Sequence, residues 1–265
     1  MDLISNLAYI HPDAKIGKNV TIEPFAYIAG NTVIGEGTWL GPGAILMGGA
    51  RIGANCRIFS GAVISGIPQD LKFQGEETTA EIGDNTTVRE FATINRGTKA
   101  KEITRVGTNC LIQSYAHVAH DCVLGDYVIL GSHAGLAGEV EIDDYAIVSP
   151  YSVVHQFVRI GTHAFVQATG KAGKDVPPYI LAGREPLSYT GINSIGLRRK
   201  NFDNDKIYQI QEIYRIIYQR GLNISDAVEF VEANLPASDE RDRIILFIRN
   251  SKRGIIKGYF DGEKE

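Results

Sequence analysis

The residues whose types and spacing could do chemistry gather in one run, Ala116-His117-Val118-Ala119-His120-Asp121-Cys122. Two of the six histidines lie in this run, and Asp121 follows His120 directly. A carboxylate beside an imidazole can orient the ring and stabilise its protonated form. A general base needs both effects when it removes a proton from a hydroxyl group. The run therefore predicts general-base chemistry at His120, assisted by Asp121.

Two further interpretations of these histidines remain open at this point. An HxxH pair can contribute zinc ligands, as in some trimeric enzymes that bind zinc through histidines of adjoining subunits. No other residues complete a convincing ligand set, so no metal site is predicted. The histidines can also be polar surface groups without a chemical role, which residue type alone favours.

Composition limits the possible classes of function. The 265 residues include 27 basic and 31 acidic side chains, and the net charge of -4 predicts no general attraction to nucleic acid or anionic membranes. No apolar run approaches the roughly 20 residues that span a bilayer, and the N-terminus lacks the features of a secretory signal. Three cysteines, none in a CxxC pair, favour a reduced, cytoplasmic protein: Cys56, Cys110 and Cys122.

The elements that must position these residues are defined by a repeat of six. From Ile10 to Val166 in steps of six, 24 of 27 positions are Ile, Leu or Val, and the exceptions are Asp70, Glu76 and Ala100. Glycine often follows the aliphatic residue, and a small residue usually stands four positions after it. All three cysteines occupy this small-residue position, which predicts that they belong to the core.

A period of six excludes an amphipathic helix, whose period is 3.6, and turn residues recur too often for long strands. The pattern predicts a prism in which each hexad is a short strand plus a corner, and three hexads close one coil of about 18 residues. The large aliphatic side chain then points inward at every repeat. Val118 is one of these, so His117 and His120 are expected on either side of it, near the outer surface.

Two breaks and one change of pattern complete the organisation. Residues 65–81 and 95–105 are polar and Gly-rich and are expected as loops extruded from the prism, where binding groups often lie. After Pro178 the pattern becomes helical, with expected helices over 203–222, from a cap at Ser225 to Pro236, and after Ser238. We therefore expect a β-helix over residues 1–190 and an α-helical domain over 191–265.

Several motifs, in order along the chain, resemble the bacterial acyl-[acyl-carrier-protein]–UDP-N-acetylglucosamine O-acyltransferases over essentially the whole sequence. The motifs are residues 69–76 (QDLKFQGE), 117–122 (HVAHDC), 154–157 (VHQF), 175–179 (DVPPY), 191–199 (GINSIGLRR) and 251–256 (SKRGII). The resemblance implies a mainly β fold, a left-handed parallel β-helix of hexapeptide repeats followed by a C-terminal α-helical domain. It also implies the first step of lipid A biosynthesis, transfer of a 3-hydroxyacyl chain to the glucosamine 3-hydroxyl.

The resemblance implies a role for each motif residue. His120 would be the general base, Asp121 would orient and polarise it, and the backbone N–H of Gly138 would stabilise the oxyanion. Eight residues would bind substrate: Gln69, Asp70 and Lys72 on the first loop, His117, His155 and Gln156 along the sugar and acyl cleft, and Asn193 and Arg199 at the nucleotide. Three positions depart from the family pattern: Glu139, Ile195 and Lys200.

The implied partners are an acyl carrier protein carrying a 3-hydroxyacyl chain, UDP-N-acetylglucosamine, and two further copies of the chain in a homotrimer with clefts between subunits. No cofactor is implied. The acidic carrier protein is expected to dock on basic groups near the C-terminal domain. The later N-acyltransferase of the same pathway is a rival, but it carries an extra N-terminal domain for which the hexads, beginning at Ile10, leave no room. Two more classes compete with this function, a zinc hydratase on the same prism and a non-catalytic scaffold.

Overall fold

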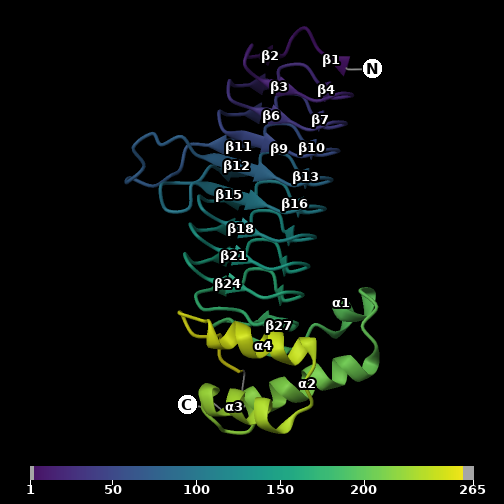
Figure 1. Ribbon diagram of the computed structural model, residues 1–265, viewed down its shortest axis with the longest axis vertical. Helices are drawn as coiled ribbons and strands as arrows, with labels where there is room; N and C mark the ends of the chain where they lie inside the picture. Colours follow the sequence, from purple (N-terminus) through teal and green to yellow (C-terminus); the bar gives the residue numbers. More distant parts are fainter. Residues whose placement is uncertain (1–2, 259–265) are drawn as a thin grey trace.

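Most hexads fold into a two-residue strand and a tight corner, and stacked hexads form the three walls of a prism (Figure 1). The computed structural model describes residues 3–258. Every inward-facing aliphatic residue of the repeat from Ile22 to Val166 is at most 3% exposed. The small residues beside the corners are buried as well, including the three free cysteines. The predicted inward direction of the repeat is therefore confirmed.

The strands form three sheets whose neighbours pair in parallel, except for one antiparallel pair at the C-terminal end. The first sheet contains β1 (Leu3–Ile4), β4 (Thr21–Ile22), β7 (Trp39–Leu40), β10 (Arg57–Ile58), β13 (Thr87–Val88), β16 (Leu111–Ile112), β19 (Ile129–Leu130), β22 (Ile147–Val148), β25 (Phe165–Val166), β27 (Ile180–Gly183) and the antiparallel β28 (Ser188–Ile192). The second contains β2 (Tyr9–Ile10), β5 (Tyr27–Ile28), β8 (Ile45–Leu46), β11 (Val63–Gly66), β14 (Thr93–Asn95), β17 (His117–Val118), β20 (Gly135–Leu136), β23 (Val153–Val154) and β26 (Lys171–Ala172). The third contains β3 (Lys15–Ile16), β6 (Val33–Ile34), β9 (Ala50–Ile52), β12 (Thr79–Ile82), β15 (Ile103–Val106), β18 (Val123–Leu124), β21 (Glu141–Ile142) and β24 (Arg159–Ile160).

The two breaks in the repeat are insertions of whole hexads. Paired strands are usually 18 residues apart, as in His117 and Gly135, but Ile52 pairs with Ile82 and Ile82 with Val106. The additional residues lie in two loops, 67–78 between β11 and β12 and 96–102 between β14 and β15. Because each insertion is a multiple of six residues, the inward positions on both sides keep the same phase.

The corners place one residue per hexad in the left-handed region of backbone space. Asn19, Asp121 and Glu139 have φ values of 57°, 61° and 61°. Asparagine and aspartate tolerate this conformation better than most residues. At other corners aromatic rings stack from coil to coil, as in Tyr127 and Tyr145, with ring centroids 4.7 Å apart. The left-handed corners are therefore stabilised in two ways, by residue types that tolerate this conformation and by ring stacking between coils.

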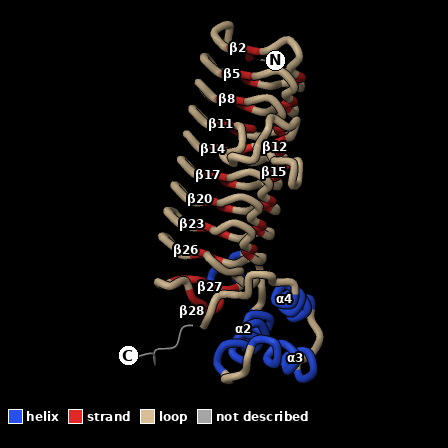
Figure 2. Tube along the Cα trace, turned by 90° about the vertical axis from the view of Figure 1, so that its left-hand side faces the viewer, coloured by secondary structure: helices blue, strands red, loops and turns tan. Residues whose placement is uncertain are grey.

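Four helices follow the strands within residues 3–258: α1 (Ser194–Arg199), α2 (Asn204–Gln219), α3 (Ile224–Asn234) and α4 (Asp239–Arg249). The last three gather at one end of the prism (Figure 2). Tyr214 of α2 is fully buried there, and its hydroxyl donates to the Pro178 carbonyl at 2.7 Å. None of the helices in the described part of the chain is both long and apolar enough to cross a bilayer.

The helix starts match the sequence only in part. Ser238 caps α4, as expected, by accepting a hydrogen bond from the backbone N–H of Arg241. The cap expected at Ser225 is wrong, because Asn223 caps α3 and Ser225 lies inside the helix. Asparagine caps as well as serine does, and it stands two residues earlier. The short helix α1, capped by Asn193, is not among the helices expected from the sequence.

The ring of His163 continues the stack, with its centroid 4.8 Å from that of Tyr145, and its titration predicts a loss of stability in acid. Burial lowers the pKa of His163 to about 4, with smaller effects from the charges of Lys200 and Arg243. An unfolded histidine titrates near 6.5, so the unfolded chain binds an extra proton as pH falls from about 6.5 towards 4. The full shift would cost about 2 kcal/mol per chain at pH 5. Because the ring is only half-buried, solvent screening reduces the expected cost to about 1 kcal/mol.

A His163→Phe variant keeps a ring in the stack but removes this titration. Denaturant unfolding at pH 7 and pH 5 should therefore show a smaller acid-induced loss of stability than in the unmodified chain. An equal loss in both proteins would contradict the assignment.

Candidate active site

The hexad places the candidate catalytic side chains at one corner of the prism. In β17, Val118 points into the core, while His117 faces outward from the second sheet. His120 follows at the corner, and Asp121 takes the left-handed position with φ of 61°. The next coil repeats this arrangement with Gly138 level with His120 and Glu139 level with Asp121, because β17 pairs with β20 in register. Both histidines thus lie outside the core, as expected.

His120 and Asp121 form a hydrogen-bonded pair. The Nδ1 atom of His120 lies 2.8 Å from Oδ2 of Asp121. The histidine side chain is 12% exposed, whereas the aspartate side chain is completely buried. No group within residues 3–258 hydrogen-bonds to the other ring nitrogen, Nε2, so the pair presents one free nitrogen at the outer surface. This is the arrangement that a general base requires.

The ring of His120 lies against Gly138 of the next coil. A Cβ atom at position 138 would come within 2.6 Å of Cε1 and 2.7 Å of Nε2 of His120. Only glycine therefore allows the ring to take this position. The N–H groups of Ala137 and Glu139 bond to carbonyls of neighbouring coils, but that of Gly138 has no partner among residues 3–258. It remains available to a ligand.

His117 is held by a neighbouring strand. Its Nδ1 lies 2.7 Å from the hydroxyl oxygen of Thr93 in β14. Burial lowers the pKa of His117, and the charge that His120 can carry lowers it further, so its neutral form is favoured. Burial raises the pKa of the Cys122 thiol to about 12, which leaves no thiolate nucleophile beside the pair. No sequence signal marks Thr93, whose hydroxyl meets His117 only because the two strands pair.

His155 and Gln156 extend the same wall further along the prism. Gln156 stands level with His120 two coils away, because β17, β20 and β23 pair in succession. His155 is exposed, and its Nδ1 lies 3.2 Å from the carbonyl oxygen of Gln156. Strand spacing of about 4.8 Å puts these side chains roughly 10 Å from the pair.

The remaining predicted binding residues lie elsewhere in the chain. Gln69, Asp70 and Lys72 belong to loop 67–78, and Asp70 accepts a hydrogen bond from the backbone N–H of Lys72 at 3.0 Å. Figure 1 shows this loop beside β11 and β12 on one side of the prism, whereas α1 lies on the opposite side, near the C-terminal end. Within residues 3–258 no hydrogen bond or ion pair joins the loop residues to His120.

The predicted nucleotide-binding residues lie at α1. The Asn193 side chain is buried, accepts from the backbone N–H of Gly196 and donates to the carbonyl of His163 at 2.9 Å. Its visible role is to cap α1 and tie it to the prism. Arg199 is exposed at the last residue of α1. One chain therefore brings together the residues of the corner but not those of the loop and α1.

The structure shows the surroundings of two residues that depart from the family pattern, Ile195 and Lys200. Ile195 is 65% exposed on α1. The ammonium group of Lys200 stands over the stacked rings of Tyr127 and Tyr145, 5.3 and 4.7 Å from their centroids. Lys200 therefore contacts the ring stack, at a favourable distance for a cation–π interaction.

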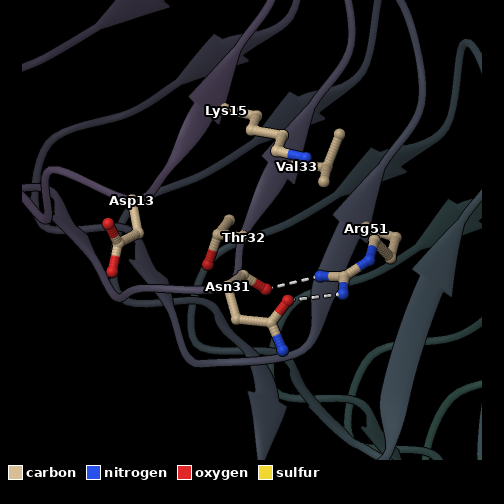
Figure 3. A pocket seen from close by; sticks show the side chains of 6 residues that line it. All are labelled: Asp13, Lys15, Asn31, Thr32, Val33 and Arg51. Carbon is tan, nitrogen blue, oxygen red and sulfur yellow. Dashed lines mark hydrogen bonds between the residues drawn. The ribbon is translucent and has the colours of Figure 1, made fainter.

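Two further observations on the described chain concern metal binding and a hollow away from the corner. No group of three or more His, Cys, Asp or Glu side chains in residues 3–258 has the geometry to hold a metal ion. A shallow hollow nearer the N-terminal end is lined by Asp13, Lys15, Asn31, Thr32, Val33 and Arg51 (Figure 3). Arg51 is bonded there to the side chain of Asn31 at 2.7 Å, and no histidine is among the lining residues.

Comparisons with known proteins agree with this geometry. The hexapeptide model of bacterial transferases matches residues 31–66 and 103–138, and the model for the second domain of UDP-N-acetylglucosamine O-acyltransferase matches residues 175–256. The fold and the corner site thus define a hexapeptide-repeat acyltransferase.

Relatives identify the particular family. The acyl-[acyl-carrier-protein]–UDP-N-acetylglucosamine O-acyltransferase of Janthinobacterium sp. (strain Marseille) is 43% identical, over 97% of this chain and 100% of that protein. The crystal structure of a UDP-N-acetylglucosamine acyltransferase from Bacteroides fragilis 9343 is 56% identical with a TM-score of 0.95, covering 96% of this chain and 100% of that one. The enzyme from Francisella novicida is 40% identical with a TM-score of 0.93, covering 96% and 94%. The chain belongs to the acyl-[acyl-carrier-protein]–UDP-N-acetylglucosamine O-acyltransferase family, and its predicted left-handed parallel β-helix is confirmed.

The close contact at Gly138 predicts the effect of one methyl group. Gly138→Ala should displace the His120 ring and lower kcat by about 100-fold, because small misplacements of a catalytic group are costly. Thermal stability should fall much less than activity, because the loop donors still satisfy the Asp121 carboxylate and the inward side chains of the coil are untouched.

Gly48→Ala is the matched control. Gly48 occupies the same position of its hexad, and a Cβ there would meet only the Gly30 carbonyl oxygen, at 3.4 Å. Steady-state kinetics and thermal unfolding of both variants provide the measurement. Equal activity of the two variants would show that the contact with His120 is irrelevant to the reaction.

Proposed function

We propose that this acyltransferase moves a 3-hydroxyacyl chain from acyl carrier protein to the 3-hydroxyl of the glucosamine unit of UDP-N-acetylglucosamine, the first step of lipid A biosynthesis. The single observation that carries the proposal is the His120–Asp121 pair seated on Gly138, in a chain of this family. The names of the relatives support the two substrates.

The proposed reaction is a direct attack with one histidine as proton carrier. Nε2 of His120 takes the proton of the sugar hydroxyl as its oxygen attacks the thioester carbonyl. The carbonyl oxygen becomes an oxyanion, to which the free N–H of Gly138 donates. When the intermediate collapses, the carbon–sulfur bond breaks and the imidazolium of His120 returns its proton to the leaving thiolate. No covalent acyl-enzyme forms, which agrees with the high pKa of Cys122.

The neighbouring groups have supporting roles in this proposal. Asp121 keeps the proton on Nδ1 of His120 and stabilises the imidazolium. His117 is favoured in its neutral form, so it can line the acceptor site without placing a second positive charge beside the base. His155 and Gln156 extend the wall for the sugar and acyl groups.

We further propose that three copies of the chain form the working enzyme. Within residues 3–258, Gln69, Asp70 and Lys72 make no hydrogen bond or ion pair to the catalytic corner of their own chain, and Asn193 and Arg199 lie at α1. A rotationally symmetric trimer would supply the loop of one copy to the corner of another. The cleft between copies would then contain residues of two chains.

The first test identifies the product. The chain is incubated with UDP-N-acetylglucosamine and a panel of 3-hydroxyacyl carrier proteins, and the product is analysed by mass and by type of linkage. An ester at the 3-hydroxyl is expected. His120→Ala should remain folded and lose about 1000-fold in kcat.

Different outcomes would favour the competing functions. An amide product would favour the N-acyltransferase, about one bound zinc per chain would favour a hydratase, and no transfer at all would favour a scaffold. Full activity in His120→Ala would remove His120 from the role of base.

The second test asks whether the site is shared. Lys72→Ala and His120→Ala chains are each expected to be nearly inactive alone. Co-expressed, they should recover on the order of a quarter of normal activity, because mixed trimers retain one intact cleft. Size-exclusion chromatography with light scattering checks the assembly. No recovery in confirmed mixed trimers would place both residues in the same chain's site.

A further inference from the structure

The structure assigns Thr98, in loop 96–102, as a positioning residue that sets the tautomer and orientation of His120 through Asp121. The inference rests on the proposed function, in which Nε2 of His120 is the base. It gives a role to the second inserted loop, which none of the predicted site residues occupies.

The carboxylate of Asp121 is buried and has four hydrogen-bond donors around it. Its Oδ1 accepts from the backbone N–H groups of Thr98 at 2.9 Å and Lys101 at 3.2 Å. Its Oδ2 accepts from the hydroxyl of Thr98 at 2.6 Å and faces Nδ1 of His120 at 2.8 Å. A carboxylate has about four acceptor positions, and all four are occupied here. Three of the four donors come from the loop.

The direction of the Thr98 hydroxyl is fixed by a second contact. Its oxygen accepts from the backbone N–H of Ala100 at 3.2 Å. With that donor in place, the hydroxyl hydrogen points to Asp121 Oδ2. An ionised carboxylate can only accept, so the remaining partner, Nδ1 of His120, must carry a hydrogen. The lone pair is thereby assigned to Nε2, the nitrogen that lies against Gly138.

The loop itself is tied down at both ends, so its donors are held in place. The hydroxyl of Thr78 donates to the Gly97 carbonyl at 2.6 Å, and the N–H of Gly97 donates to the carbonyl of Thr79 at 3.1 Å. The ammonium group of Lys101 bonds to Glu141 at 3.1 Å. These contacts anchor the loop to the third sheet and hold its donors in fixed positions around the carboxylate of Asp121.

Without the Thr98 hydroxyl, Oδ2 would keep only His120 as a partner. The carboxylate would then be free to rotate about the two backbone donors on Oδ1. Rotation would move Oδ2 away from Nδ1, and the neutral ring could place its hydrogen on Nε2. A ring with its hydrogen on Nε2 cannot accept the substrate proton there. The loss should therefore appear in the chemical step and not in substrate binding.

The test compares Thr98→Val, which removes the hydroxyl at similar size, with Thr98→Ser, which retains it. Thr38→Val is the control, because the buried hydroxyl of Thr38 bonds to the Gly53 carbonyl at 2.8 Å far from the corner. Thr98→Val should lower kcat at least about tenfold and leave both KM values within about twofold. Thr98→Ser should stay within about threefold of the unmodified enzyme, and Thr38→Val should be unaffected.

A spectroscopic measurement on the protein alone provides the second readout. ¹⁵N NMR of histidine-labelled full-length protein reports which ring nitrogen carries the hydrogen, with the His120 signals assigned from a His120→Gln sample. The unmodified protein and Thr98→Ser should show His120 hydrogenated at Nδ1, and Thr98→Val should lose this form. If Thr98→Val does not fold, Thr98→Ala takes its place.

Three results would overturn the inference: an Nε2-hydrogenated His120 in the unmodified protein, unchanged kcat and tautomer without the hydroxyl, or a Thr98→Ser variant as impaired as Thr98→Val. Failure of the proposed function looks different. In that case the His120 tautomer seen by NMR would still change in Thr98→Val and not in Thr98→Ser. The product assay or the activity of His120→Ala would instead contradict the proposed chemistry.

Discussion

The constraint on which the structure depends is the requirement for one aliphatic side chain inside every hexad. Each coil surrounds a narrow interior that only these side chains and the small residues beside the corners can fill, and both sets are buried. Protein interiors are close-packed, so a polar or oversized residue at an inward position would open the coil or leave a void. The backbone pairing between coils then follows, because coils of equal perimeter stack in register. The outward-facing positions are consequently free to vary, and the proposed catalytic residues His117 and His120 occupy such positions.

The same constraint explains where functional loops can be inserted. A loop extruded at a corner leaves and re-enters the prism without displacing an inward side chain, so the strands on both sides keep their aliphatic residues in the interior. Both loops respect the period, and the strands on either side pair in register. In the proposed mechanism, the loop 96–102 would serve chemistry without touching the substrate. It leaves the wall beside the catalytic corner and returns with backbone and hydroxyl donors directed at a buried carboxylate.

Much of this arrangement can be predicted from the sequence, for physical reasons that differ between features. The prism follows from periodicity, because the hexad repeats more than twenty times and few other folds bury such a pattern. The positions of His117 and His120 outside the core follow from the phase of Val118. The contacts of Thr93 and Thr98 do not follow, because each depends on pairing between residues more than 20 positions apart. The start of α3 is harder to predict because two good capping residues, Asn223 and Ser225, compete within three positions.

The helices and the last strands at the C-terminal end of the prism determine where the stack of coils ends. A parallel stack has no intrinsic length, since its last coil presents the same unpaired backbone groups as every coil before it. Such an edge can recruit further strands and lead to fibrous growth. Here β28 turns back antiparallel on β27. The Tyr214 hydroxyl of α2 donates to the carbonyl of Pro178, just before β27. This end therefore acts as a terminator that prevents the stack from being extended by further strands there.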